Sequence, residues 1–167
     1  MVCSFAACQE NFVHRYCAVD SQDWQKQYKG KYHIEDIKEK GNYQLKAEVR
    51  IDKQYLYKDL WLEIETHIRT EKSLNDTCYK DTVCIDIVKQ NGEMSGTGRN
   101  IMEYKTPVRE MSLAPSDTLD ICMRHILTTK PVPGVHDIGI LLIPHHLVSG
   151  SINAKQDKKQ DGKAPKR

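Results

Sequence analysis

The 167-residue sequence has no run of about eighteen apolar residues, so no segment is suited to span a bilayer as a helix. Its glycines lack the spacing of a phosphate-binding loop, and its serines lack the Gly-x-Ser-x-Gly motif. None of the six cysteines is spaced as Cys-x-x-Cys, and no nearby histidine stands at zinc-ligand spacing. These absences predict a protein with no catalytic residues, no bound metal and no cofactor.

Basic residues are concentrated at the C-terminus. Residues 155–167 hold six basic and two acidic side chains, whereas the whole chain has a net charge of only +2. The rest of the chain is therefore slightly acidic, which is not typical of a nucleic-acid-binding protein. We expect residues 149–167 to form a disordered basic tail, and we expect no nucleic-acid partner.

The body of the chain alternates apolar and polar residues with a period of two. In 60–69, for example, Leu60, Leu62 and Ile64 alternate with Trp61 and Glu63. A helix would need apolar residues three and four apart, so this pattern predicts a strand with one face on a core. The predicted strands are 43–52, 60–69, 82–88, 108–113, 118–127 and 136–144, with 31–37 as a strand or edge segment.

Turn signals separate these strands at intervals of roughly ten residues. Asn91-Gly92 is a hairpin signal, and Gly96 and Gly98 suit a tight turn or a bulge. Ser21 could cap a short helical turn over 21–27. Because strands do not alternate with helices, we predict an all-β fold, an antiparallel β-sandwich of jelly-roll or Ig-like type. The sandwich domain is expected at 31–148, after an N-terminal anchor segment at 8–30.

The opening stretch Phe5-Ala6-Ala7-Cys8 resembles the lipobox of bacterial lipoproteins, in which small residues precede a lipidated cysteine. The resemblance implies that Cys8 carries the lipid and that residues 1–7 are the remnant of a signal peptide. Two or three acyl chains on one residue make a stable membrane anchor. The alternative is a chance occurrence in an unstructured N-terminus, since only seven residues precede Cys8.

Further stretches follow the lipobox in a recognisable order. They are Asn11-Phe12-Val13, Trp24-Gln25-Lys26, Tyr55-Leu56-Tyr57-Lys58-Asp59-Leu60-Trp61-Leu62, Asp81-Thr82-Val83, Tyr104-Lys105-Thr106-Pro107 and Val135-His136-Asp137-Ile138-Gly139-Ile140. Together they resemble the gliding motility lipoprotein GldH family, with Leu56 where proline is usual and Asp59 where asparagine is usual. The resemblance implies a periplasm-facing β-sandwich lipoprotein whose partners are envelope proteins of the gliding or secretion apparatus. It assigns no activity to particular residues.

The aromatic residues Tyr55, Tyr57 and Trp61 form the candidate binding patch. If Trp61 points outward, it and the two tyrosines could act as aromatic anchors of an interface. If the strand is central with both faces covered, Trp61 belongs to the core, and this is the arrangement we expect. Trp24 is expected to pack the N-terminal segment down.

Histidines and cysteines are the residues of this chain that could bind a metal or form disulfides. His145-His146, with His125 and His136, could suggest a metal, but adjacent strand residues point to opposite faces, so we expect none. In an oxidising compartment, four cysteines would allow three pairings, among which the sequence does not choose. These four are Cys17, Cys78, Cys84 and Cys122.

These observations predict a non-enzymatic, lipid-anchored envelope protein, an accessory component of gliding motility or a related surface-export machinery that acts by protein–protein contact. A carbohydrate-binding β-sandwich lipoprotein is the alternative, with Tyr55, Tyr57 and Trp61 as the sugar platform. A hydrolase would need a cleft with convergent polar groups.

Overall fold

The computed structural model describes residues 12–35, 37–70, 76–128 and 132–145. These ranges form strands and connecting loops, and they contain no helix long and apolar enough to cross a membrane. The strands are β1 (Val13–Ala18), β2 (Gly30–Ile34), β3 (Gly41–Asp52), β4 (Asp59–Thr70), β5 (Thr77–Asp86), β6 (Thr97–Gly98), β7 (Ile101–Leu113), β8 (Asp117–His125) and β9 (Val135–Pro144).

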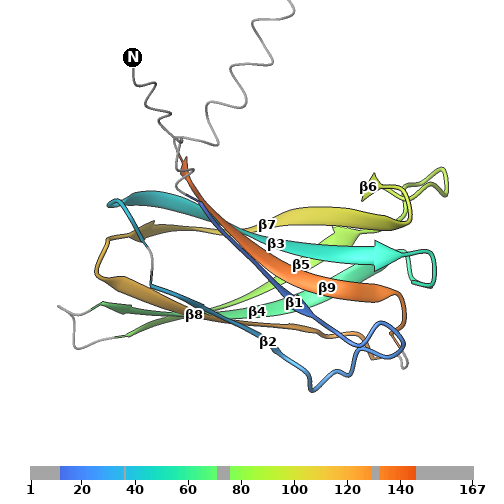
Figure 1. Ribbon diagram of the computed structural model, residues 1–167, viewed down its shortest axis with the longest axis horizontal. Helices are drawn as coiled ribbons and strands as arrows, with labels where there is room; N and C mark the ends of the chain where they lie inside the picture. The colour runs from blue at the N-terminus through green and yellow to red at the C-terminus, as the bar shows by residue number, and fades with distance from the viewer. Residues whose placement is uncertain (1–11, 36, 71–75, 129–131, 146–167) are drawn as a thin grey trace, which may run out of the picture.

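The strands form two antiparallel sheets stacked face to face (Figure 1). The five-stranded sheet has the order β1-β9-β3-β7-β6, and the four-stranded sheet has the order β2-β8-β4-β5. The predicted all-β sandwich is therefore confirmed. The order brings the first and last strands of the chain together, because β1 pairs with β9 along its whole length.

The core lies between the sheets and is built by the alternation seen in the sequence. Leu45, Val49 and Ile51 on β3 face Leu60 and its neighbours on β4, and all are fully buried. Removal of these apolar side chains from water is the main driving force for the stacking. The predicted strand at 136–144, the most apolar of the predicted strands, corresponds to β9, which lies between β1 and β3.

One open side of the sandwich is closed by an ion pair between the sheets. Arg109 on β7 donates two hydrogen bonds to Asp81 on β5, at 2.9 Å from Nε and 2.7 Å from Nη2. The guanidinium group also lies over the ring of Tyr79, 4.1 Å from the ring centroid. Bidentate geometry and stacking together make this a specific contact between the two layers.

The predicted strand at 108–113 is wrong in its extent, since β7 begins at Ile101 and passes through Pro107. Lys46 pairs with Pro107 while Leu45 pairs with Arg109, so Val108 is an extra residue at an irregularity of the ladder. Proline is tolerated there because it lies at this bulge, and because β6 pairs only with Met102 and Glu103.

Two other local predictions also differ from the structure. The fifth strand spans Thr77–Asp86 rather than 82–88, because its register with β4 continues as far as Thr77. Residues 21–27 form bends and a turn, not a helical turn, and the carbonyl of Ser21 accepts a hydrogen bond from Gly134. By contrast, the Asn91-Gly92 signal does mark a turn, with Gly92 at a φ of 84° between the bridged residues Val88 and Met94.

The sandwich has two distinct ends. At the entry end, β1 starts and β9 finishes, because Val13 pairs with Leu142. At the far end, β3 finishes and β4 and β7 begin, because Asp52 pairs with Ile101 and leads into the loop before Asp59. The 12 residues of β3, at about 3.3 Å each, separate these ends by about 40 Å.

Candidate functional site

The three residues of the predicted aromatic patch differ in their exposure to solvent. Trp61 is 42% exposed on the outer face of the four-stranded sheet, whereas Tyr55 is only 8% exposed. The hydroxyl of Tyr55 donates a hydrogen bond to the carbonyl of Asp59 at 2.7 Å. The rings of Tyr55 and Tyr57 meet edge-on, with their centroids 5.5 Å apart. Tyr55 is therefore a core residue, and Tyr57 is partly buried against the core.

The expectation that Trp61 is covered is wrong. The strand is central, as expected, because β4 lies between β8 and β5. However, the second sheet covers only the inner face of β4, which carries Leu60 and Leu62. Centrality within a sheet does not decide whether both of its faces are buried.

Exposed apolar side chains gather at one end of the sandwich. The large hydrophobic residues that are exposed in the described ranges are Tyr28, Leu56, Trp61 and Ile101. All four lie at the far end: just before β2, in the β3–β4 loop, near the start of β4 and at the start of β7. Leu56, in the loop, is the most exposed of them at 76%. We call these four residues the far-end apolar set.

The other predicted candidates have ordinary structural positions or lie outside the described residues. Cys8 and His146 are outside the described ranges. Trp24 is buried as predicted and meets His125 edge-on, with ring centroids 4.8 Å apart. His136 contacts Asp52 at 2.8 Å.

The four cysteines of the sandwich are free thiols, which leaves each possible pairing unformed in this structure. Cys17, Cys84 and Cys122 are partly buried, and Cys78 is exposed. In the described part of the chain, no three His, Cys, Asp or Glu side chains are grouped to hold a metal ion.

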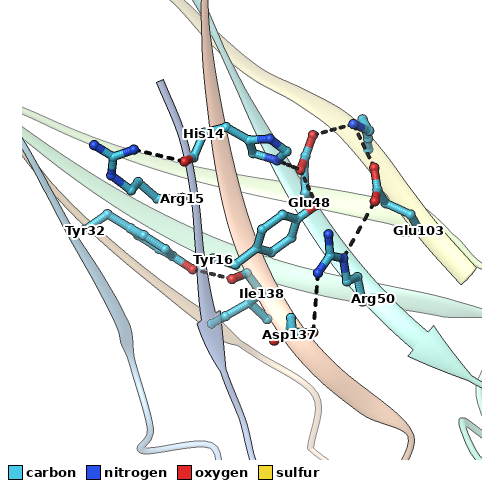
Figure 2. A network of polar contacts seen from close by, with 10 residues as sticks. His14, Arg15, Tyr16, Tyr32, Glu48, Arg50, Glu103, Asp137 and Ile138 are labelled. Atoms are coloured by element: carbon cyan, nitrogen blue, oxygen red, sulfur yellow. Dashed lines mark hydrogen bonds and ion pairs between the residues drawn. The ribbon is translucent and has the colours of Figure 1, made fainter. Parts of the chain in front are cut away.

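A polar network on the outer face of the five-stranded sheet was not predicted from the sequence (Figure 2). Its centre is one row across four strands: Tyr16 on β1 pairs with Gly139 on β9, Gly139 with Glu48 on β3, and Glu48 with Lys105 on β7. Gly139 makes the row possible, because a Cβ there would lie 2.6 Å from the ring carbons Cδ1 and Cε1 of Tyr16. The tyrosine ring therefore lies across the glycine. Figure 2 shows Tyr16 reaching Glu48, to which its hydroxyl donates a hydrogen bond.

The carboxylate of Glu48 is fully buried although it lies on the outer face of the sheet. Its Oε2 accepts hydrogen bonds from His14 Nε2 at 2.5 Å and from the Tyr16 hydroxyl at 2.6 Å. Lys105 Nζ lies 2.9 Å from Oε1 and 2.8 Å from Glu103. We call Glu48, His14, Tyr16 and Lys105 the Glu48 network.

The contacts of Glu48 set the charge states in the network. Burial alone would raise the pKa of Glu48, but the hydrogen bonds from Tyr16, Lys105 and His14 hold it below its usual value. Burial and the adjacent Glu48 carboxylate raise the pKa of Tyr16, so the phenol stays protonated and donates. Burial alone would lower the pKa of Lys105, but the carboxylates of Glu103 and Glu48 raise it above its usual value.

Arg50 extends the network along the same face. Its guanidinium carbon lies 4.0 Å from the centroid of the Tyr16 ring, and its nitrogens lie 3.7 Å from Glu103 and 3.9 Å from Asp137. Tyr16 is thus held between Arg50 above, Gly139 below and Glu48 at its hydroxyl. The arrangement fastens β1, an edge strand, to β3, β7 and β9.

A cleft of about 490 Å³ lies between the end of β5 and strands β6 and β7. Its lining includes Cys84, Asp86, Glu103 and Lys105, but no histidine. Glu103 and Lys105 are ion-paired with each other at 2.8 Å, so neither stands ready as a base or an acid. The hydroxyl of Ser95, which also lines the cleft, donates a hydrogen bond to the backbone carbonyl of Asp86 at 2.5 Å.

The fold is a two-sheet β-sandwich, and the Glu48 network ties its first strand to the edge of the five-stranded sheet. The sequence profile of the GldH lipoprotein family matches residues 11–142, and the chain belongs to this family. The resemblance found in the sequence is thereby confirmed. The family consists of gliding-motility lipoproteins, which are membrane-anchored envelope proteins and are not known as enzymes.

No curated protein matches this chain. Among solved structures, the "Structure of Eiger TNF from S. frugiperda" aligns over 92% of this chain and 90% of that chain. The two share 9% sequence identity with a TM-score of 0.32, which is too low to support an argument about fold or function.

Proposed function

We propose that this protein is a non-enzymatic accessory component of the gliding machinery, or of a related surface-export machinery, that acts by protein–protein contact. Cys8 carries the lipid anchor and the sandwich faces the periplasm. The observation that carries the proposal is the position of the far-end apolar set, at the end of the sandwich opposite to the start of β1.

The apolar side chains support a contact surface because four large hydrophobic residues are exposed at the same end of the sandwich, and covering apolar surface with a partner is favourable. Leu56 is 76% exposed and Trp61 is 42% exposed, in the same loop–strand segment. Aromatic and large apolar residues of this kind dominate the binding energy of protein interfaces. The occupant that fits is therefore an apolar patch on another envelope protein.

The topology supports the orientation of this surface. Only residues 9–12 separate the proposed lipidated Cys8 from Val13, the first residue of β1. The entry end would then face the membrane, and the far end would project about 40 Å away from it. The Glu48 network suits a tethered strand, because it ties β1 to three neighbouring strands.

Site-specific photo-crosslinking in cells that carry the native machinery tests the contact. A crosslinking residue at position 56 or 61 is expected to capture an envelope protein, whereas one at Asn42, exposed at the entry end, captures none. Substitution of Leu56→Asp with Trp61→Ala should impair gliding or export while the protein level is maintained. Equal capture at all three positions, or normal function of the double variant, would contradict the proposal.

The anchor is tested separately by Cys8→Ser. The variant should leave the membrane fraction, whereas Cys17→Ser, which changes a thiol within the sandwich, should remain in it. If Cys8→Ser stays membrane-bound, Cys8 is not the anchor.

The exposure of Trp61 also supports a second candidate, a carbohydrate-binding lipoprotein, because sugar rings bind on exposed tryptophan faces. Tyr55 cannot contribute to such a platform because it lies in the core. Titration of envelope polysaccharide should change the fluorescence of the wild-type protein and leave that of Trp61→Phe unchanged. No response in either protein would contradict this candidate.

A further inference from the structure

A row of four side chains crosses the outer face of the four-stranded sheet. The register pairs His33 on β2 with Asp120 on β8, Asp120 with His67 on β4, and His67 with Cys78 on β5. His67 and Cys78 are both exposed, and Cys78 Sγ lies 3.6 Å from His67 Nε2. Among the four cysteines of the sandwich, Cys78 has a histidine as its cross-strand neighbour, whereas Cys122 pairs with Lys31 and Glu65.

The spacing of this pair suits two ligands of one zinc ion. Zinc binds thiolate sulfur at about 2.3 Å and imidazole nitrogen at about 2.0–2.1 Å in a tetrahedral arrangement. Two such bonds at a tetrahedral angle place sulfur and nitrogen about 3.6 Å apart. The distance between Cys78 Sγ and His67 Nε2 has this value, so an ion can be seated between them without a change of strand register.

The charges around the pair do not oppose a cation. Asp120 is the other cross-strand neighbour of His67, and its Oδ1 lies within hydrogen-bond distance of His33 Nδ1, at 2.6 Å. The guanidinium group of Arg69 is paired with Asp120. Lys80 is two residues from Cys78, and its Nζ lies 3.0 Å from Glu63 Oε2 and 3.5 Å from Glu65 Oε1, so its charge is paired with these carboxylates.

The pair does not complete a site by itself. No third His, Cys, Asp or Glu side chain joins it as a ligand within the described ranges, whereas structural zinc has four ligands. Cys78 lies on β5, the edge strand of its sheet, so a second copy can approach it from outside. A twofold axis through the ion would bring the same two residues from that copy and give a Cys₂His₂ set.

We propose that zinc bridges two copies of this chain through Cys78 and His67 of each copy. Each thiol releases its proton to solvent as the zinc–sulfur bond forms, and each histidine binds through the Nε2 lone pair, so no oxidant or reductant is required. This proposal is independent of the contact at the far end, because the two sets share no residue. Trp61 lies on the same outer face of β4 as His67, but near the start of the strand, whereas His67 lies near its end.

The test uses the full 167-residue chain in a phosphine reductant, with its mass measured by native mass spectrometry and light scattering. Zinc should convert the monomer into a dimer with one zinc per two chains, and a chelator should reverse the change. Cys78→Ser and His67→Ala should remain monomeric, whereas the matched control Cys122→Ser, on the same face, should dimerise like the wild type. Cobalt should give the visible bands of a tetrahedral thiolate site in the wild type and not in Cys78→Ser.

Three results would overturn the proposal. The first is a chain that stays monomeric at every zinc concentration, with or without bound metal. The second is a dimer that persists in Cys78→Ser or His67→Ala. The third is a dimer that survives the chelator and disappears only with more reductant, since that dimer would be a disulfide. Circular dichroism of each variant checks that the fold is retained. We expect it to be, because His67 and Cys78 are both exposed.

Discussion

Substitution of Glu48 by glutamine is expected to destabilise the protein at neutral pH, although Glu48 lies on the outer face of its sheet. Glutamine keeps the shape of the side chain but removes the charge. It also places an amide NH₂, which only donates, where the carboxylate accepts from His14, Tyr16 or Lys105. At least one donor of the Glu48 network then loses its acceptor.

The magnitude follows from burial of the partners. Breaking a fully buried ion pair costs about 3–5 kcal/mol, because a charge is left without compensation. The Glu48 side chain has an exposed fraction of 0%, but those of His14 and Lys105 are 32% and 44%, so both partners can return to water. We therefore expect Glu48→Gln to lower the free energy of unfolding by about 2 kcal/mol, between the surface and fully buried limits.

The effect should depend on pH with a definite sign. The pKa of Glu48 is lowered in the folded protein from an ordinary value of 4.5. Its contribution to stability is therefore fully present above that value, and it is lost as the pH falls through the lower, folded-state pKa. Glutamine does not titrate, so the difference in stability between wild type and variant should shrink as the solution is acidified.

Urea unfolding, followed by the fluorescence of the buried Trp24, measures this difference at pH 7 and at about pH 3. Glu110→Gln serves as the control, because Glu110 lies on the same sheet with a side chain that is 61% exposed. It should change stability by no more than about 0.5 kcal/mol. Equal stability of wild type and Glu48→Gln at pH 7, or a difference that is unchanged in acid, would refute the reasoning.

Three further predictions concern stability and are checked by the same unfolding assay. Gly139→Ala should cost about 1–3 kcal/mol, because the new Cβ displaces the ring of Tyr16, and Tyr16→Ala should relieve part of that cost. Asp81→Asn should cost about 1 kcal/mol, since it breaks the bidentate pair with a partly exposed Arg109, and 1 M salt should weaken the wild-type pair. Trp61→Ala should lower the free energy of unfolding by no more than about 1 kcal/mol, because the side chain is 42% exposed. A larger loss would show that Trp61 is packed within the fold rather than available to a partner.

Much of the fold could be predicted because alternation with a period of two is a local property. The positions of Leu45, Leu60 and Leu62 in the core follow from that alternation once a strand is assumed. Strand ends were predicted less well. The predicted strand at 108–113 begins directly after Pro107, but the real strand continues through this proline because a bulge and a nearly free edge remove the need for a backbone hydrogen bond there.

The candidate site could be predicted only in part. Tyr55 and Trp61 are close in sequence, but the β3–β4 loop turns Tyr55 into the core, whereas Trp61 lies on the outer face of β4. The Glu48 network could not be predicted, because the alternation in 43–52 places Glu48 on the face opposite to Leu45 and Val49, and that face is expected to be solvated. Gly139, inside the most apolar run of the chain, was the available signal, since glycine in a strand often marks a close approach of another group.

The amino-acid sequence by itself determined that this chain forms strands, which side of each strand faces the core, and the family to which the chain belongs. The tertiary structure alone decided which strands became neighbours. Tyr16, Glu48 and Gly139 meet because β9 returns to lie between β1 and β3, and His67 meets Cys78 through the register of β4 with β5. The alternation of apolar and polar residues indicates which side chains of one strand are buried. Contacts across a sheet depend instead on strand order and register, which are set only when distant segments pack together.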